Sequence, residues 1–386
     1  VDLTESIKMA DFITLVDEES WQEFMPKTVD KSLFRKLLKY YDEDVVSGAG
    51  LRIRRMAKAA DELPPTERVK RIAEIFSHFR NPDKETVLTP WRVVNLHLSS
   101  MVGGYCFLNE QFDPQEVLEE PRLVDQGQVT EDIFLNPEAR ILEMNSKSGL
   151  YPLYMAYSLY AMKLPGPEDK MPLEQTQALW QETVEQQIFV LCKTRMAESI
   201  TRRTLVGYQD WTVNTTYIPH LLERMEKDPQ RLAKKLQRTD TWGKEGQPMK
   251  FDAIVGNPPY QEMDGGNNAS AVPLYQLFME QAILVEPHYI SMIMPARWYS
   301  GGRGLDKFRS EMLNDERLCK MMDFSDSNDC FPGVDIAGGV CYFLWDKSAH
   351  GECKVISVHN GKQSISERKL NEYDTCLLYT SDAADE

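Results

Sequence analysis

The segment Phe251-Asp-Ala-Ile-Val-Gly256, followed directly by Asn257-Pro258-Pro259-Tyr260, decides the fold of this chain. The short apolar run predicts a buried strand, and the prolines end it because proline has no backbone N–H to donate. A polar residue, two prolines and an aromatic residue then form a rigid loop at the carboxyl end of that strand. In sheets of parallel strands, ligands bind beyond these ends. The segment therefore predicts a functional loop on an α/β sheet.

Strands and helices alternate on both sides of this segment, from about residue 139 onward. Short apolar runs predict strands at 139–145, 186–194, 251–256, 289–295, 319–326, 340–347 and 353–359. Amphipathic stretches predict helices at 149–164, 196–208, 273–285 and 305–313. This alternation is typical of a mostly parallel sheet covered on both faces. Because the last strands follow one another without a helix, we expect the late edge of the sheet to be antiparallel.

Residues 1–85 have a different pattern, in which apolar residues recur at the spacing of amphipathic helices. Val69 and Ile72 give one example, in a helix that we expect to begin after the break Leu63-Pro64-Pro65. The pattern predicts an N-terminal helical connector at 1–85, followed by one α/β domain at 86–375.

Both ends of the chain indicate a fragment of a longer protein. The last segment, 376–386, resembles an in-frame translation of a sequencing adaptor, so we expect it to be a non-native tail. The chain begins at Val1 without an initiator methionine, and its first residues lack the basic and apolar regions of a secretion signal. Seven scattered cysteines, none spaced Cys-x-x-Cys, favour a cytoplasmic protein with reduced thiols.

The 386 residues carry 44 Lys and Arg against 60 Asp and Glu, a net charge of −16. This balance argues against a simple nucleic-acid coat protein, but it allows an enzyme that meets DNA through a local basic surface. One such stretch runs from Lys193 to Arg238, with ten basic against five acidic residues. It is either a DNA-facing surface or a solvated helical face. No apolar run approaches the roughly 18 residues that cross a bilayer, so we expect no membrane partner.

The loop from Asn257 to Tyr260 contains the groups needed to activate an exocyclic amine. The side-chain oxygen of Asn257 and the carbonyl oxygen of Pro258 can accept both amine hydrogens, which localises the lone pair on nitrogen. The amine then attacks an electrophilic methyl group in line, and positioning and electrostatics supply most of the rate. Pro259 adds rigidity, and the ring of Tyr260 offers a face on which a flipped-out base stacks. This chemistry needs no metal, and the six histidines show no metal-ligand spacing.

Placed after a strand, this loop resembles the catalytic loop of S-adenosylmethionine-dependent amino-methyltransferases. Over roughly residues 80–347 the chain resembles the adenine-N6 DNA methyltransferase module of restriction–modification enzymes. The closest kind is the single-chain enzyme in which methylation is fused to cleavage or to a helicase. The resemblance implies a Rossmann-like class I fold with a mostly parallel seven-stranded sheet. It also implies S-adenosylmethionine as cofactor, double-stranded DNA with a flipped-out adenine as substrate, and fused nuclease, helicase or target-recognition domains outside this chain.

Three further segments carry the resemblance. The pair Thr89-Pro90, within 84–91, resembles a turn that packs against the methionine end of the cofactor. The stretch 141–149 resembles the cofactor-binding turn after the first strand, which implies cofactor contacts from Glu143, Asn145, Ser146, Ser148 and Gly149. The glycine-rich stretches 295–304 and 326–339 resemble loops that line the target-base pocket.

The sequence departs from the family pattern at two places. Lys147 stands where the family has glycine, so the turn is either wider or crowded by the side chain. The family also has an acidic residue at the end of the second strand. Here that strand ends in Leu191-Cys192-Lys193-Thr194, and Glu198 is the nearest acid.

Aromatic residues outside the loop allow two interpretations. Four tyrosines recur every three residues after the first strand and predict core packing rather than a stacking surface: Tyr151, Tyr154, Tyr157 and Tyr160. Trp298 and Tyr299 follow a strand end, and they either line the base cleft or belong to the core.

Other functions remain open at this point. The same loop chemistry suits N4-cytosine methylation and methylation of a protein glutamine amide, although the glutamine enzymes lack glycine-rich loops like 301–304 and 338–339. From a different class, the chain is a DNA-binding or assembly subunit that kept the fold and lost the cofactor through Lys147. We expect DNA sequence choice to reside in a domain after Thr375, so that residues 1–375 alone bind cofactor but methylate DNA poorly.

Overall fold

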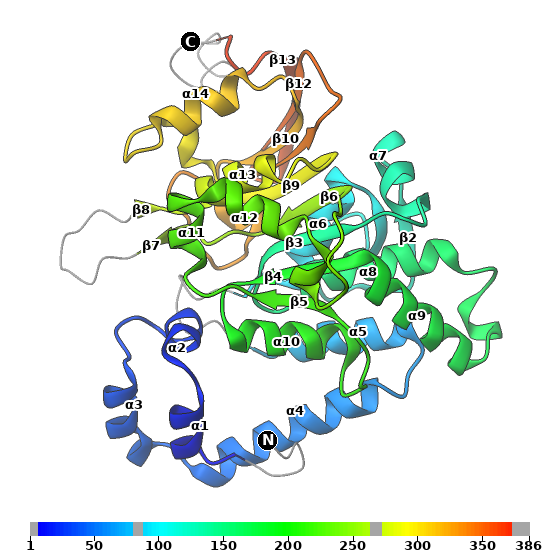
Figure 1. Cartoon of the computed structure of the whole chain (residues 1–386), viewed down its shortest axis with the longest axis vertical. Helices are drawn as coiled ribbons and strands as arrows, with labels where there is room; N and C mark the ends of the chain where they lie inside the picture. Colours follow the sequence, from blue (N-terminus) through cyan, green and yellow to red (C-terminus); the bar gives the residue numbers. More distant parts are fainter. Residues whose placement is uncertain (1–6, 80–87, 263–271, 373–386) are drawn as a thin grey trace. The chain divides into compact units, whose positions relative to one another are not determined.

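A computed structural model of the chain describes residues 7–79, 88–262 and 272–372 (Figure 1). The chain divides into two compact units. Unit 1 comprises residues 1–95, 105–122 and 146–219, and unit 2 comprises residues 96–104, 123–145 and 220–386. The predicted boundary at residue 85 and the predicted tail at 376–386 both lie outside the described residues.

Unit 1 begins with the helices that the spacing of apolar residues predicts: α1 Met9–Leu15, α2 Glu18–Phe24, α3 Lys31–Leu37, η1 Leu38–Tyr40, α4 Glu43–Ala60 and α5 Pro65–Ser77. An aspartate starts three of them, because its side chain accepts a hydrogen bond from a backbone N–H of the first turn. Asp17 caps α2 in this way, Asp30 caps α3 and Asp42 caps α4. A small core forms between α2 and α3, where Trp21 packs edge-to-face on Phe34 with ring centroids 5.3 Å apart.

The α/β part of unit 1 contains the parallel strands β4 Ile188–Cys192 and β5 Asn214–Tyr217. Three helices pack against β4: α8 Leu150–Lys163, α9 Leu173–Gln187 and α10 Arg195–Val206. A short helix, η3 Glu168–Lys170, lies between α8 and α9. The four tyrosines predicted to pack in the core are confirmed there, because all four are buried within α8.

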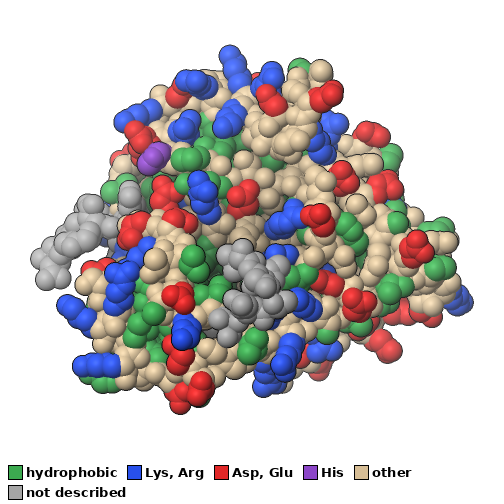
Figure 2. Space-filling view, turned by 60° about the horizontal axis from the view of Figure 1, so that its bottom comes forward, with side chains coloured by type: hydrophobic (Ala, Val, Ile, Leu, Met, Phe, Trp, Pro, Cys, Tyr) green, Lys and Arg blue, Asp and Glu red, His purple; other side chains and the backbone are tan. Residues whose placement is uncertain are grey.

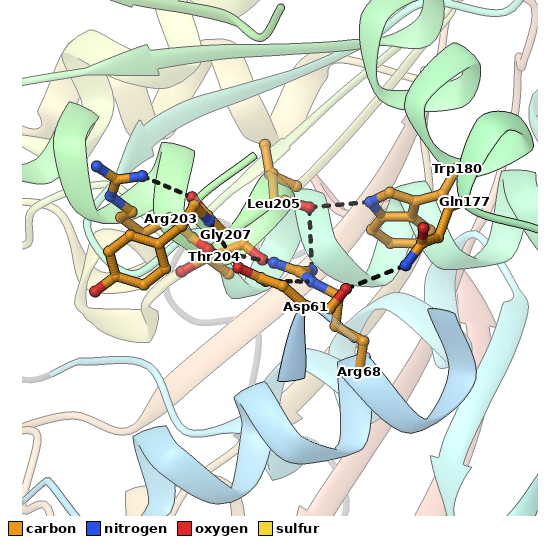
Figure 3. Close-up of polar contacts among 9 residues, drawn as sticks. Asp61, Arg68, Gln177, Trp180, Arg203, Thr204, Leu205 and Gly207 are labelled. Carbon is orange, nitrogen blue, oxygen red and sulfur yellow. Dashed lines mark hydrogen bonds and ion pairs between the residues drawn. The ribbon is translucent and has the colours of Figure 1, made fainter. Parts of the chain in front are cut away.

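A buried polar network holds the end of α10 in unit 1 (Figure 3). The guanidinium of Arg68, on α5, donates to the carbonyl oxygens of Arg203, Thr204 and Leu205 at 3.0–3.3 Å. Arg68 also pairs with Asp61 at 3.3 Å. Burial lowers the pKa of Arg68, and the neighbouring carboxylate of Asp61 opposes that shift. The helical N-terminal region therefore makes buried side-chain contacts with the end of α10.

Among the described residues, seven strands of the main sheet belong to unit 2: β3 Ile141–Ser146, β6 Ala253–Gly256, β9 Tyr289–Pro295, β10 Leu318–Phe324, β11 Val340–Asp346, β12 Cys353–His359 and β13 Lys362–Arg368. The strands β3, β6 and β9 run parallel to one another. At the late edge β11 is antiparallel to both β9 and β10, and β13 is antiparallel to β12. The expectation of an antiparallel edge is wrong for β12, which runs parallel to β10.

Over the described residues the main sheet has nine strands, in the order β13-β12-β10-β11-β9-β6-β3-β4-β5, so the expected count of seven is wrong. All seven strands predicted from apolar runs are present, and β5 and β13 are the additions. Neither has an apolar run, since β5 reads Asn-Thr-Thr-Tyr and β13 reads Lys-Gln-Ser-Ile-Ser-Glu-Arg. Both lie at the sheet edges, where backbone pairing to one neighbour suffices, and β13 is mostly exposed whereas β5 buries Asn214.

The remaining described elements are α6 Trp91–Met101, β1 Gly104–Leu108, β2 Val117–Val124, α7 Gln128–Thr130, η2 Glu131–Leu135, α11 Leu221–Lys227, α12 Pro229–Leu236, η4 Thr239–Trp242, β7 Gln261–Glu262, β8 Val272–Pro273, α13 Tyr275–Leu284, η5 Ala296–Ser300, α14 Asp306–Asn314 and α15 Ser327–Cys330. Two small sheets pair β1 with β2 and β7 with β8. Across the described segments, no helix is long and apolar enough to cross a bilayer.

Candidate functional site

The loop Asn257–Tyr260 leaves the carboxyl end of β6, as the sequence predicts. Gly256 precedes it, and an added Cβ there would lie 2.6 Å from the carbonyl oxygen of Met144. Only a residue without a side chain therefore allows β6 to approach β3 this closely. Pro258 is buried, whereas Asn257 and Pro259 are partly exposed. A rigid loop with a partly open surface thus follows a buried strand.

Asn145, at the end of β3, holds the start of this loop. Its backbone has φ 72°, an unusual value for a residue other than glycine. Its side-chain Nδ2 donates to the backbone carbonyl of Asn257 at 3.2 Å. Its other side-chain atom, Oδ1, is buried and accepts no hydrogen bond from the described residues. Asn145, which we predicted to contact the cofactor, therefore also supports the predicted catalytic loop. Its Oδ1 atom has no donor among the described residues.

Tyr260 ends the loop in a half-buried position. Its carbonyl oxygen accepts a hydrogen bond from the backbone N–H of Leu274 at 3.2 Å, just before α13. Burial raises the pKa of its phenol well above the ordinary value, and the nearby side chain of Asn257 opposes that shift. The phenol therefore stays protonated, and the ring is a neutral partner for stacking.

The predicted cofactor turn lies in unit 1, directly after Asn145. The hydroxyl of Ser146 accepts from the backbone N–H of Gly149 at 3.1 Å and bonds the hydroxyl of Thr201 at 2.9 Å. The carbonyl oxygen of Ser148 accepts from the hydroxyl of Thr204 at 2.5 Å. Two threonines of α10 therefore fix the shape of the turn.

Gly149 is the residue of this turn whose identity the geometry requires. Its φ is +78°, and an added Cβ would lie 2.9 Å from Cβ of Thr204 and 3.0 Å from Cα of Thr201. Lys147 is different, because it is partly exposed and does not have a positive φ. The backbone at Lys147 therefore does not need the glycine that the family has there.

Thr89 and Pro90 lie in unit 1 immediately before α6, with Thr89 partly buried and Pro90 exposed. The carbonyl oxygen of Pro90 accepts from the N–H of Val93 at 3.0 Å and so starts the helix. Trp91 then packs edge-to-face on Tyr154 of α8, with ring centroids 6.2 Å apart. Gly149 is the N-cap residue of α8, so this contact connects the Thr-Pro turn to the helix that follows the predicted cofactor turn.

The predicted site residues fall into two groups, one in each unit. Thr89, Pro90, Ser146, Ser148 and Gly149 belong to unit 1. Glu143, which is buried, belongs to unit 2 together with Asn145 and the loop 257–260. The peptide bond between Asn145 and Ser146 connects the two groups in the chain.

The predicted base-pocket loops meet in unit 2, where the N–H of Ala296 donates to the carbonyl oxygen of Gly339 at 3.1 Å. Trp298 and Tyr299 do not line a cleft, because only 0% and 2% of their surfaces are exposed. Of the two interpretations of this pair, the core is therefore the correct one. Trp298 packs edge-to-face on Phe308 of α14 at 6.0 Å.

The carboxyl end of β4 holds an acid that sequence reasoning missed. Glu198, the nearest acid in the chain, is half-buried in α10, and burial raises its pKa. Glu23 of α2 instead reaches this end, where its Oε2 accepts from the hydroxyl of Thr194 at 2.5 Å. No local pattern distinguishes Glu23 from the other acids of α2, so only the tertiary contact reveals it.

Basic residues gather on α11 and α12, the unit 2 part of the stretch 193–238. They line a surface hollow of about 390 Å³ that includes Arg224, Lys227, Arg231 and Lys235. Lys227 pairs with Glu223 at 2.7 Å, whereas Arg231, Lys234 and Lys235 are exposed and form no ion pair with described residues. On the face shown in Figure 2, basic and acidic side chains are intermixed. Among the described residues, no cluster of His, Cys, Asp and Glu could hold a metal ion.

Comparison with known proteins finds a protein family whose matched region includes the loop 257–260 and strand β6. Residues 186–331 match the Eco57I restriction-modification methylase family. A protein of Mycoplasma pneumoniae described as an uncharacterised adenine-specific methylase is 37% identical over 124 residues, which cover 31% of this chain and 29% of that protein. These two matches confirm the resemblance predicted from the sequence. The aligned part is less than a third of the relative's length.

Solved structures with a similar course of the chain also come from restriction–modification systems. One is a nuclease-deletion mutant of the Type ISP enzyme LlaGI, with a TM-score of 0.47, 13% identity, and coverage of 85% of this chain and 33% of that one. Another is the M protein of the Type I enzyme EcoKI, with a TM-score of 0.39, 10% identity, and coverage of 89% and 62%. Both TM-scores are below 0.5, so neither likeness bears on the function of this chain.

Proposed function

We propose that this chain is part of a DNA methyltransferase that transfers a methyl group from S-adenosylmethionine to N6 of adenine within a restriction–modification system. The observation that carries the proposal is the loop Asn257–Tyr260, held at the carboxyl end of β6 by the hydrogen bond from Asn145 to Asn257. The match of residues 186–331 to restriction-modification methylases includes this loop and supports the proposal. The fold that goes with it is a Rossmann-like class I methyltransferase fold.

In this proposal, the residues of the loop hold an adenine amine and leave its lone pair free to react. Asn257 and Pro258 accept the two amine hydrogens through oxygen atoms, which raises the electron density on nitrogen. Pro259 limits the motion of the loop, and Tyr260 stacks on the flipped base. After transfer, the amine nitrogen loses one proton to solvent. The bound cofactor supplies an electrophilic methyl group.

The residues present fit such a cofactor. Ser146, Ser148 and Gly149 form a turn that packs so closely on Thr201 and Thr204 of α10 that no Cβ fits at Gly149, which fixes the backbone of the turn. The buried Oδ1 of Asn145 lacks a donor among the described residues, and a bound ligand could supply one. We propose that these residues, with Thr89, Pro90 and Glu143, hold S-adenosylmethionine.

Double-stranded DNA is the partner in this proposal. Arg231, Lys234 and Lys235 are exposed basic residues in the same unit as the loop, and they fit contacts to backbone phosphates. Base choice, by contrast, needs groups that read base edges, which we propose for a target-recognition domain elsewhere in the full-length protein.

The test is nucleoside mass spectrometry of DNA from a methylation-free host that expresses the full reading frame containing this chain. We expect N6-methyladenine with the natural sequence, and a loss of at least about 100-fold in Asn257→Ala, because removal of one preorganised acceptor or donor costs about 10² to 10³ in rate. Asn314→Ala is the matched control, since Asn314 is exposed at the end of α14 in the same unit.

Two results would contradict the proposal in different ways. N4-methylcytosine that disappears in Asn257→Ala would keep the loop chemistry and replace the substrate. The absence of any modified base with the natural sequence would favour a protein substrate or a fold kept only for binding.

A further inference from the structure

We propose that Glu23, on helix α2, belongs to the cofactor site and accepts hydrogen bonds from the vicinal hydroxyl groups of the bound ribose. This inference rests on the proposed function, because it assigns a residue to the cofactor of that reaction. It also makes the N-terminal helical region a part of the site.

The first observation is an unused acceptor. Glu23 is only 5% exposed, and its Oε2 accepts from the hydroxyl of Thr194 at 2.5 Å. Its other oxygen, Oε1, is buried and accepts no hydrogen bond from any described residue. A carboxylate has about four acceptor positions on its two oxygens, and leaving a buried oxygen without a donor is costly. A ligand with hydroxyl groups would supply the missing donors.

The second observation is the place of this carboxylate in unit 1. Thr194 follows directly after the carboxyl end of β4, where α10 begins. Ligands bind at such strand ends in open α/β sheets, and in nucleoside sites an acid takes the ribose hydroxyls there. The chain from Leu191 to Thr194 has no acid of its own, so Glu23 is the carboxylate that the fold brings to this end.

The cofactor turn is joined to the same strand end by side-chain contacts. The hydroxyl of Ser146 bonds that of Thr201 at 2.9 Å. Thr201 in turn accepts from the thiol of Cys192, the last residue of β4, at 3.9 Å. One helix, α10, therefore contacts the turn 146–149 and the strand end beside Glu23.

Capping of α10 does not explain Glu23. The N–H of Ala197 is satisfied by the hydroxyl of Thr194 at 3.2 Å, and the N–H of Met196 by the hydroxyl of Ser20 at 3.1 Å. Across the part of the chain that the structure describes, Glu23 accepts from no backbone N–H of this helix, and its partner is the Thr194 side chain. The neighbouring Glu19 contrasts with it, because Glu19 accepts from the hydroxyl of Tyr217.

The test uses isothermal titration of the whole chain with S-adenosylhomocysteine and with its 2′,3′-dideoxy analogue. We expect the natural protein to prefer the ribose compound by at least tenfold. Glu23→Gln should weaken binding of that compound at least tenfold and leave binding of the analogue within about twofold. The matched control Glu19→Gln, on the same helix, should change neither. Thermal melting without ligand reports on any loss of structure in the variants.

The outcomes separate this inference from the proposed function. If the natural protein binds neither compound, both are overturned. If it binds the ribose compound but Glu23→Gln binds equally well, only the role of Glu23 is overturned. If the natural protein binds both compounds equally, the inference fails even when the variant cannot be folded. A Glu23→Gln variant that melts earlier but keeps its preference for ribose would show a structural role alone.

Discussion

The two ends of α10 are both held by the N-terminal helical region, yet they are held differently. At the carboxyl end, Arg68 and Asp61 form a closed network, in which Asp61 also accepts from the N–H of Tyr208 at 2.8 Å (Figure 3). At the amino end, where α2 packs against α10 (Figure 1), the carboxylate of Glu23 keeps one buried oxygen without a donor among the described residues. A closed network stabilises a fold, whereas an open acceptor is suited to a ligand. The carboxyl end of α10 therefore has the features of a structural contact, whereas its amino end has the features that we propose for a ligand site.

Arg68→Met should cause the largest loss of stability. It removes the partner of Asp61 and leaves the carbonyl oxygens of Arg203, Thr204 and Leu205 without this donor. Breaking a buried ion pair from one side costs about 3–5 kcal/mol. Chemical denaturation of the natural and variant chains measures this loss directly.

The double variant Asp61→Asn with Arg68→Met is the control for the unpaired charge. The asparagine side chain would keep an oxygen for the N–H of Tyr208 and carry no charge, so the double variant should recover part of the stability. No recovery would show that the lost hydrogen bonds to α10, rather than the stranded carboxylate, dominate. Loss of less than about 1 kcal/mol in Arg68→Met would contradict the contrast between the two ends.

Asp323, in β10, is a buried carboxylate without a full set of hydrogen-bond donors, so its ionisation should lower the stability of the folded chain. Burial raises its pKa to about 6, opposed by the nearby hydroxyl of Tyr299 and by the charge of Arg368, and neither carboxylate oxygen accepts a hydrogen bond from the described residues. The unfolded chain releases this proton near 3.8, so between pH 3.8 and about 6 the folded state holds a proton that the unfolded state has lost. The contribution of Asp323 to stability therefore falls as pH rises through this window, by about 3 kcal/mol, and stays low above it.

The variant Asp323→Asn lacks this titration. Its unfolding free energy relative to the natural chain should therefore rise by about 2.4 kcal/mol between pH 4 and pH 7, because part of the change has already occurred at pH 4. Denaturation curves of both chains at several pH values give the difference, in which other titrating groups cancel. A difference that does not change with pH would mean that the carboxylate is already ionised and paired at pH 4.

Much of the fold could be predicted from the sequence because its strands are short apolar runs. The seven runs from 139–145 to 353–359 all became strands. The two edge strands β5 and β13 could not be recognised in the same way, since backbone pairing to a neighbour forms them without an apolar face. The burial of Trp298 was likewise undecided, because the position after a strand end does not determine burial.

The residues of the candidate site also differ in how far local sequence patterns predict them. The loop 257–260 and the turn 146–149 are local patterns, and their surroundings are as the strand assignments imply. Glu23 is 171 residues away from Thr194 in the sequence, and α2 contains two other glutamates, Glu18 and Glu19. A contact at this separation depends on how α2 packs on α10, and no periodicity in either helix specifies that packing.

Thr194→Val gives the smallest expected effect and examines the amino end of α10 alone. The variant removes the hydroxyl that accepts from the N–H of Ala197 and donates to Glu23. Loss of an N-cap costs about 1 kcal/mol, and loss of the hydrogen bond to Glu23 costs about 1 kcal/mol more, which is together still below the cost at Arg68. Chemical denaturation measures the loss, with Thr216→Val of β5 as a control threonine. A loss as large as that of Arg68→Met would make the amino end a structural anchor too, and would leave the unused oxygen of Glu23 as the only difference between the two ends.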